Sequence, residues 1–225
     1  MSIGFRVLPI ERRVPSDLVK LAAQLPVANV SDAMNRMFAG GASLRPMHGG
    51  GVLAGPAITV KARPGDNLML HRALDIAEPG DVVVVDGGGD LTNALIGELM
   101  VAHAESRGLA GIVIFGAIRD ASAIRTGSFP VFAAGVSHRG PYKDGPGEVN
   151  VPIAIEGMVI HPGDLILGDE DGLIAVGINE AEAVCAKAAA KHAAETEQMA
   201  KIRRGENPRA WVVETLKRLG CEGIW

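Results

Sequence analysis

An arginine–aspartate pair is the feature of this sequence whose residue types best suit catalysis. Arg119 and Asp120 follow an apolar run, residues 111–115, that predicts a buried strand. Parallel sheets bind their ligands at the carboxyl ends of the strands. At such an edge the carboxylate can hold a hard cation, while the guanidinium faces a substrate carboxylate or a developing enolate oxygen. The pair therefore predicts a site for a small acid beside a divalent metal ion.

A second candidate element is the start of a predicted helix at Gly97-Glu98-Leu99-Met100. The first turn of a helix has backbone N–H groups without internal partners and carries a partial positive charge, so it can seat a small carboxylate. We expect Gly97, Leu99 and Met100 to bind substrate. Glu98 adds an acid beside that seat, which could orient water on a metal, and we expect it to take part in catalysis.

Each of these elements also has a purely structural interpretation. An arginine–aspartate pair at a strand end more often forms a surface ion pair or a helix cap. An acid in a first turn, such as Glu98, stabilises the helix dipole. The Gly87–Asp90 loop lets backbone approach closely, but glycines after a strand usually make turns. The acidic Asp169–Asp171 segment lacks the ligand alternation of a calcium loop, which favours a hairpin turn.

Two rival chemistries are weaker. Val82–Val85 followed by Gly87–Asp90 faintly resembles the strand and glycine loop of nucleotide or methyl-donor folds, which would suggest a methyltransferase. A dinucleotide fingerprint needs spaced glycines that open a helix directly, whereas these are contiguous. A metal-free aldolase would need a Schiff-base lysine. Lys61 is the only lysine within a clear strand, and no neighbour in the sequence obviously activates it.

The elements that must position these residues predict an α/β fold. Val82–Val85 and Gly111–Phe115 are continuous apolar runs typical of strands buried on both faces. The helix between them, residues 97–107, implies a right-handed parallel crossover. Ser16 is predicted to cap the first helix, and Pro208 to open the last. The other predicted elements are helices at 16–39 (interrupted at Pro26), 68–77, 179–204 and 208–219, and strands at 55–60, 131–134, 151–155, 158–160, 165–167 and 173–176.

Composition excludes several classes of function. The 225 residues are 48% hydrophobic and 21% charged, which suits one domain with a substantial core. A net charge of −4 without a dominant basic cluster argues against nucleic-acid binding. The two cysteines, Cys185 and Cys221, show no disulfide or zinc spacing. With neither a secretory signal nor an apolar run of about 18 residues, we expect a cytoplasmic protein that does not enter membranes. The Ala-rich C-terminal helix suggests a homo-oligomer.

Several short motifs together resemble one known family over about residues 27–178. It contains the 4-hydroxy-4-methyl-2-oxoglutarate / 4-carboxy-4-hydroxy-2-oxoadipate aldolases and the regulator of ribonuclease activity A. The motifs are Val30-Ser31-Asp32-Ala33, Gly80-Asp81, Gly97-Glu98, Arg119-Asp120, Phe129–Phe132, Glu148–Pro152 and Pro162–Asp164. The resemblance implies a single swivelling β/β/α domain over residues 1–225, with a helical extension at 179–225. It also implies trimers, sometimes paired into hexamers.

The resemblance further implies a Mg²⁺ or Mn²⁺ ion with Asp120 as its direct ligand and water in much of its shell. Pyruvate would contact Arg119 and the backbone around Leu99 and Met100. The family's aldolases usually carry Asp where this chain has Glu98, so one extra methylene shifts the geometry there.

An acid from a neighbouring subunit's C-terminal helix would complete such a site, with Glu195 and Glu197 as the candidates. The implied function is a metal-dependent lyase that cleaves 4-hydroxy-2-oxo diacids to pyruvate or decarboxylates oxaloacetate. Both reactions pass through a pyruvate enolate, whose charge a cation and Arg119 would stabilise. The alternative is a non-catalytic regulator that binds and inhibits an endoribonuclease.

Overall fold

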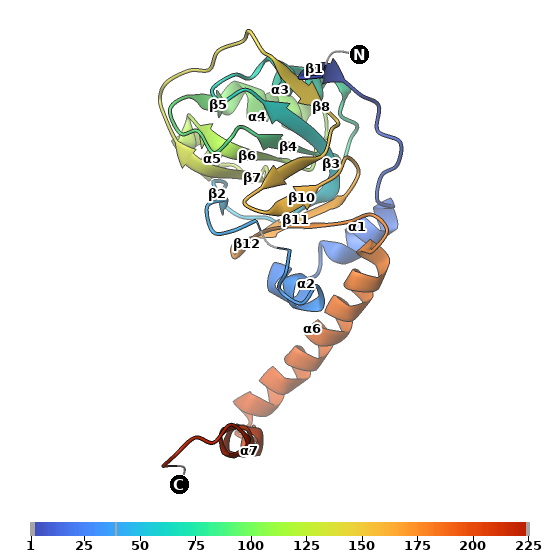
Figure 1. The fold of residues 1–225 in the computed structure, drawn as a ribbon, viewed down its shortest axis with the longest axis vertical. Coiled ribbons are helices and arrows are strands. Elements are labelled where there is room, and N and C mark those ends of the chain that lie inside the picture. The colour runs from blue at the N-terminus through green and yellow to red at the C-terminus, as the bar shows by residue number, and fades with distance from the viewer. Residues whose placement is uncertain (1–2, 39, 224–225) are drawn as a thin grey trace.

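A large mixed sheet dominates the computed structural model, which describes residues 3–38 and 40–223 (Figure 1). Along the main path of the sheet the strand order is β1-β8-β3-β4-β6-β7-β2. Two further strands extend β3, since β11 pairs with β3 and β12 pairs with β11, while β5 pairs with β6. The strands are β1 (Phe5–Val7), β2 (Arg45–Pro46), β3 (Leu53–Ala62), β4 (Val82–Asp86), β5 (Ala94–Ile96), β6 (Gly111–Ile118), β7 (Val131–Val136), β8 (Gly147–Val149), β9 (Ile153–Ile155), β10 (Met158–Ile160), β11 (Leu165–Asp169) and β12 (Gly172–Val176).

The centre of the sheet is parallel, as its apolar runs predict. β3, β4, β6 and β7 pair in parallel, with Val82 of β4 opposite Gly111 of β6. Val82–Val85 is fully buried because both faces of β4 are covered. On one face a core cluster joins the sheet to α3 (Leu68–Ile76) and α4 (Glu98–Ser106), and on the other a second cluster includes β9, β10 and β12. This double covering explains why the central strands lack polar alternation.

Helices extend the fold beyond the sheet at both ends of the chain. α1 (Ser16–Ala22), α2 (Val27–Ala33) and the start of α6 (Ala181–Arg203) pack on β11 and β12 through a third core cluster. Figure 1 shows α6 leaving the body of the molecule and carrying α7 (Ala210–Arg218) at its far end. No residue of α7 is buried. The prediction of an α/β fold with helical N- and C-terminal extensions is confirmed.

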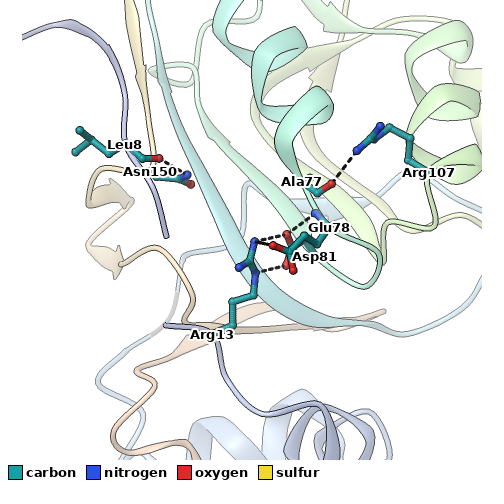
Figure 2. Close-up of polar contacts among 7 residues, drawn as sticks. All are labelled: Leu8, Arg13, Ala77, Glu78, Asp81, Arg107 and Asn150. Atoms are coloured by element: carbon teal, nitrogen blue, oxygen red, sulfur yellow. Dashed lines mark hydrogen bonds and ion pairs between the residues drawn. The ribbon is translucent and has the colours of Figure 1, made fainter. Parts of the chain in front are cut away.

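A buried ion pair fixes the N-terminal segment to the turn before β4 (Figure 2). Arg13 donates from Nε and Nη2 to the two carboxylate oxygens of Asp81 at 3.0 and 3.2 Å. Asp81 is only 1% exposed, and it also accepts the Glu78 N–H at 2.8 Å. Beside it, Arg107 at the end of α4 donates to the Ala77 carbonyl at 3.0 Å. The ends of α3 and α4 and the start of β4 are therefore tied together.

The predicted helix at 16–39 is wrong in its second half. The chain breaks at Pro26 as expected, but α2 begins directly after it at Val27 and ends at Ala33, well before Gly40-Gly41. Asn35 and Arg36 take positive φ angles of 58° and 61°, which a right-handed helix does not allow. An asparagine whose backbone adopts the left-handed conformation ends a helix, and hydrophobic periodicity does not reveal such a residue.

The first helix starts at residue 16 as predicted, but its N-cap is Pro15 and not Ser16. The predicted start of the last helix is wrong, because α7 begins at Ala210, two residues after Pro208. The short elements β1, β2, β5, β8 and α5 (Ala121–Thr126) were not predicted. Among the described residues, no helix is both long and apolar enough to cross a membrane.

Candidate active site at the carboxyl ends of β5 and β6

The parallel pairing of β5 and β6 brings the predicted site residues together. Both strands end at the same edge of the sheet, where the Arg119 N–H donates to the Ile96 carbonyl at 2.9 Å. The residue after Ile96 is Gly97, the N-cap of α4, and the residue after Arg119 is Asp120, the N-cap of α5. Two helix starts and one arginine–aspartate pair therefore meet at one point.

Asp120 adopts a left-handed backbone conformation, with φ 55° and ψ 35°. Aspartate tolerates this region better than most residues, but it still costs roughly 1–2 kcal/mol and such residues cluster at functional sites. Its side chain makes no cap bond to its own helix, α5. Instead, Oδ2 accepts the Glu98 N–H of α4 at 3.0 Å and lies 3.7 Å from Arg119 Nε. The left-handed turn thus aims the carboxylate across the site at the neighbouring helix.

Gly97 is required here for space and not for its backbone angles. Its φ of −149° is open to any residue, but a β-carbon would collide with the Asp120 carboxylate and come within 2.9 Å of Arg119 Cγ. The absence of a side chain lets the arginine–aspartate pair lie directly against the start of α4. The Gly97-Glu98 and Arg119-Asp120 motifs are therefore one packing unit.

A cavity of about 350 Å³, called the main cavity from here on because it adjoins the predicted site, opens beside this unit. Gly97, Leu99, Met100 and Arg119, the residues predicted to bind substrate, all line it. In the first turn of α4, the Glu98 N–H is taken by Asp120 and the Met100 N–H donates to the Gly97 carbonyl at 3.1 Å. Among the described residues, the Leu99 N–H has no hydrogen-bond partner, so it is the backbone donor left for a ligand.

The acids of the site lie outside that cavity. Asp120 lines a neighbouring hollow of about 300 Å³ together with Ser137 and His138, and Arg119 borders both spaces. Glu98 lines a third hollow, of about 180 Å³, with Glu105. The structure thus brings the backbone of Glu98 to Asp120 but turns its side chain away from the predicted substrate seat.

The charge of the main cavity favours acids. Its lining includes Arg119, Lys143 and His71 but, among the described residues, no carboxylate. The start of α4 adds the partial positive charge of a helix N-terminus. Arg119 and Asp120 have 45% and 43% of their side chains exposed, so both remain accessible to a ligand. A small anion is the ligand that this surface suits.

A divalent cation fits the site only with a largely aqueous shell. No group of three or more His, Cys, Asp or Glu side chains among the described residues could hold a metal ion. Asp120 offers one accessible carboxylate, and Mg²⁺ is commonly held through one or two carboxylates while it keeps several waters. The residues therefore suit a hard, hydrated cation and not a structural zinc site.

Three polar residues of the cavity were missed in the sequence. Asn67 stands at the N-cap of α3, His71 lies one turn into that helix, and Lys143 comes from the loop after β7. Burial lowers the pKa of His71, and the nearby positive charge of Lys143 lowers it further. An asparagine before a helix is normally a capping residue, so its type alone gave no functional signal.

Asp66 explains how the loop that carries Lys143 is held in place. It is 2% exposed, and its Oδ2 accepts the backbone N–H groups of Asp144 and Gly145 at 2.7 and 2.8 Å. Its Oδ1 accepts the Leu68 N–H at 2.9 Å, which caps α3. Asp66 therefore holds together the segments that carry Asn67 and Lys143, two residues that line the cavity.

The structural interpretations hold for two other motifs. The Gly88 N–H donates to Asp86 Oδ1 at 3.0 Å, so the glycine loop is a turn, and none of its glycines lines the cavity. Asp169 accepts the N–H groups of Asp171 and Val27, both at 2.9 Å, as expected of a hairpin turn.

The rival lysine and the candidate C-terminal acids lie elsewhere. Lys61 lines a separate hollow with Glu148. Glu195 accepts from Asn29 at 2.6 Å and pairs with Lys191 at 3.0 Å within its own chain, and these contacts lower its pKa.

Comparisons with known proteins agree with the motifs. Residues 27–175 match the model of the RraA-like family, described as Aldolase/RraA. A protein of Halalkalibacterium halodurans named "Putative 4-hydroxy-4-methyl-2-oxoglutarate aldolase" is 38% identical over 177 residues, covering 79% of this chain and 84% of the relative.

Two solved structures are similar to large parts of the fold. An uncharacterized protein from Pseudomonas syringae pv. tomato has a TM-score of 0.76 at 26% identity, covering 86% of this chain and 95% of its own. The RNA-processing inhibitor RraA from Thermus thermophilis has a TM-score of 0.62 at 32% identity, covering 67% and 92%. On the family match and the identity to its relatives, this chain belongs to the RraA-like family of aldolases and RraA proteins.

Proposed function

We propose that this chain is a divalent-metal-dependent lyase that cleaves 4-hydroxy-2-oxo diacids to pyruvate and also decarboxylates oxaloacetate. One observation carries the proposal: the left-handed Asp120 places its carboxylate between Arg119 and the start of α4, at the edge of a cation-lined cavity. A binding surface for a protein partner has no need of a strained acid in that position.

The residues of this chain suit the charge changes of the reaction. Cleaving the bond beside a 2-oxo acid leaves a pyruvate enolate, so negative charge develops on one oxygen. The Arg119 guanidinium can donate hydrogen bonds to that oxygen as well as to a substrate carboxylate, because it carries several donors in one plane. The Leu99 N–H and the dipole of α4 hold the substrate carboxylate.

Asp120 is the residue that would hold Mg²⁺ or Mn²⁺. When bound, such an ion supplies further positive charge for the enolate. Glu98, whose family counterpart is usually Asp, extends one methylene further, and its side chain lies in the adjoining hollow. We propose that it orients water from there. The name of the Halalkalibacterium halodurans relative supports the aldolase assignment.

Pyruvate release is the direct test. Purified protein is supplied with 4-hydroxy-4-methyl-2-oxoglutarate or oxaloacetate, and pyruvate is followed with a coupled dehydrogenase. Activity should require Mg²⁺ or Mn²⁺ and stop with EDTA. Arg119→Ala and Asp120→Ala should each lose at least about 100-fold, as expected for charge stabilisation in a transition state. Arg125→Ala, an exposed arginine of α5, is the matched control and should keep full activity.

A second candidate is a regulator that binds an endoribonuclease. The similarity to the RNA-processing inhibitor from Thermus thermophilis favours it. This candidate predicts a stable complex with the nuclease that survives Asp120→Ala. If no complex forms at micromolar concentration and pyruvate release depends on metal, the lyase is the only one of the two candidate functions that remains.

A further inference from the structure

Asn67 is buried in the wall of the main cavity for a reason that helix capping does not supply. It is 2% exposed and occupies the N-cap position of α3, yet it makes no side-chain cap bond. Asp66 caps the helix instead, because its Oδ1 accepts the Leu68 N–H. The amide of Asn67 instead borders the cavity that Arg119 and Leu99 also line.

The orientation of this amide is fixed by its donors. Nδ2 donates to the Leu95 carbonyl at 2.8 Å and lies 3.4 Å from Met100 Sδ. Turning the amide over would place Oδ1 against the Leu95 carbonyl, and two acceptors repel each other. The oxygen is therefore held as an acceptor, and it has no hydrogen-bond partner among the described residues.

A buried acceptor without a partner is costly. Leaving such a group unpaired costs on the order of the penalty for removing it from water, so it calls for a donor from a ligand or from water. His71, one helical turn further along α3, has the same feature, since its Nε2 is buried and unpartnered. Asn67 and His71, two residues that line the cavity beside Arg119, therefore each hold an unpaired buried polar atom.

We propose that Asn67 Oδ1 accepts a hydrogen bond from the 4-hydroxyl of the substrate and makes the site selective for hydroxylated oxo acids. This rests on the proposed function. A 4-hydroxy-2-oxo diacid with both carboxylates ionised has the hydroxyl as its only hydrogen-bond donor. The carboxylates of the substrate can bind Arg119, the Leu99 N–H and Lys143. A carbonyl or carboxylate oxygen of the substrate would be repelled by Asn67 Oδ1, because both atoms are acceptors. Oxaloacetate in its keto form has no hydroxyl and cannot make this contact.

Substrate selectivity in an Asn67→Leu variant tests the assignment. Leucine keeps the volume of the side chain and removes its acceptor. Cleavage of 4-hydroxy-2-oxoglutarate should fall about tenfold in kcat/KM, the loss expected for one neutral hydrogen bond, while oxaloacetate decarboxylation should stay within about twofold. Equal losses for both substrates would mean that the amide serves only to hold Leu95, and would overturn the proposal, as would no loss for either.

A binding measurement on the unaltered chain separates this proposal from the proposed function. Titration calorimetry with EDTA present compares 4-hydroxy-2-oxoglutarate with 2-oxoglutarate, which differ only in the hydroxyl, so no turnover is needed. Preference of about tenfold for the hydroxylated acid supports the role of Asn67. Equal binding, or binding of neither, overturns it. A chain that shows the preference but releases no pyruvate with metal would refute the lyase and leave the selectivity standing.

Discussion

The Asp120 carboxylate accepts the Glu98 N–H at 3.0 Å, so a residue two positions beyond the end of β6 caps the helix that follows β5. This contact gives Asp120 two separable roles. As an acceptor it holds the start of α4, and as a charged group it can hold a cation beside Arg119. Replacing it with asparagine or alanine distinguishes the two.

Asp120→Asn should remain as stable as the native chain but lose activity. Asparagine keeps an oxygen for the Glu98 N–H and tolerates the left-handed region, whereas its neutral amide is a poor ligand for a hard cation. Asp120→Ala loses the cap and also places alanine at φ 55°, so it should be destabilised by about 1–3 kcal/mol. Urea unfolding measures the difference. Equal stability of the two variants would contradict the capping role.

Gly97→Ala should disable the site through a single methyl group. The added β-carbon meets the Asp120 carboxylate and Arg119 Cγ, so these side chains must move or the start of α4 must shift. Overpacking of this kind typically costs about 1–3 kcal/mol of stability. Displacing the pair should lower kcat/KM by at least about 100-fold, since small misplacements of catalytic groups have effects of that size. Pyruvate release and thermal unfolding check both.

Gly127→Ala is the control for that experiment. Gly127 also lies at a helix end, but its φ is −86° and the nearest atom to an added β-carbon is 3.5 Å away. It should change stability by less than about 1 kcal/mol and leave activity intact. Similar losses in both variants would point to general damage.

The centre of the fold could be predicted from the sequence because burial on both faces leaves a clear pattern. The apolar runs at Val82–Val85 and Gly111–Phe115 are parallel neighbours, and the helix between them lies within one residue of its expected ends. The same reasoning placed Arg119-Asp120 at the carboxyl edge of the sheet, where parallel strands bind their ligands. It placed Gly97 only at the start of a helix, because β5, the strand that leads into it, was not predicted.

The remainder depends on contacts that local sequence does not record. Asn67 has the residue type of a helix cap, and only the tertiary structure shows that Asp66 caps the helix and leaves Asn67 to the cavity. Lys143 reaches the site because Asp66 binds a loop 78 residues further along the chain. Glu98 likewise lines a hollow apart from the main cavity, which only the tertiary structure shows.

Protonation of His71 should destabilise the fold as the pH falls. Burial, Lys143 and His103 lower its pKa, while Asp75 acts in the opposite direction. The folded chain therefore holds fewer protons at His71 than the unfolded chain does just below the ordinary value of about 6.5. Stability is full above that pH and declines as the pH falls towards the lowered pKa.

Unfolding free energies measured between pH 8 and pH 5 test this. In His71→Gln, which cannot titrate, the decline over that range should be smaller than in the native chain. His192→Gln, the same change at a histidine of α6, is the control. If His71→Gln retains the full slope, another group is responsible.

The buried Asp81 should be among the most sensitive positions for stability. The Asp81 carboxylate accepts two hydrogen bonds from Arg13 and one from the Glu78 N–H, and Asp81 is only 1% exposed. Asp81→Ala should cost about 1–3 kcal/mol, because it removes both Asp81 contacts of Arg13, which keeps only the exposed Glu78 carboxylate, and leaves the Glu78 N–H without a partner. Asp17→Ala, which breaks an exposed pair with Lys20, should cost less than about 1 kcal/mol. Urea denaturation of both variants measures the contrast.

The C-terminal helices should be needed for self-association, which we propose as trimers or hexamers. α6 carries α7 away from the body, and no residue of α7 is buried within its own chain. Trp211 is 61% exposed and Leu219 is 68% exposed, so burial against a second copy would remove a large apolar area from water.

Light scattering on a size-exclusion column compares the native chain with Trp211→Asp. A buried charge without a partner is strongly unfavourable, so the variant should dissociate at concentrations where the native chain remains assembled. Glu214→Lys changes charge on the same helix, and Glu214 is exposed, so this variant serves as the control and should assemble normally. If the native chain and Trp211→Asp have the same mass at micromolar concentration, α7 does not hold the assembly together, and its exposed apolar side chains require a different partner.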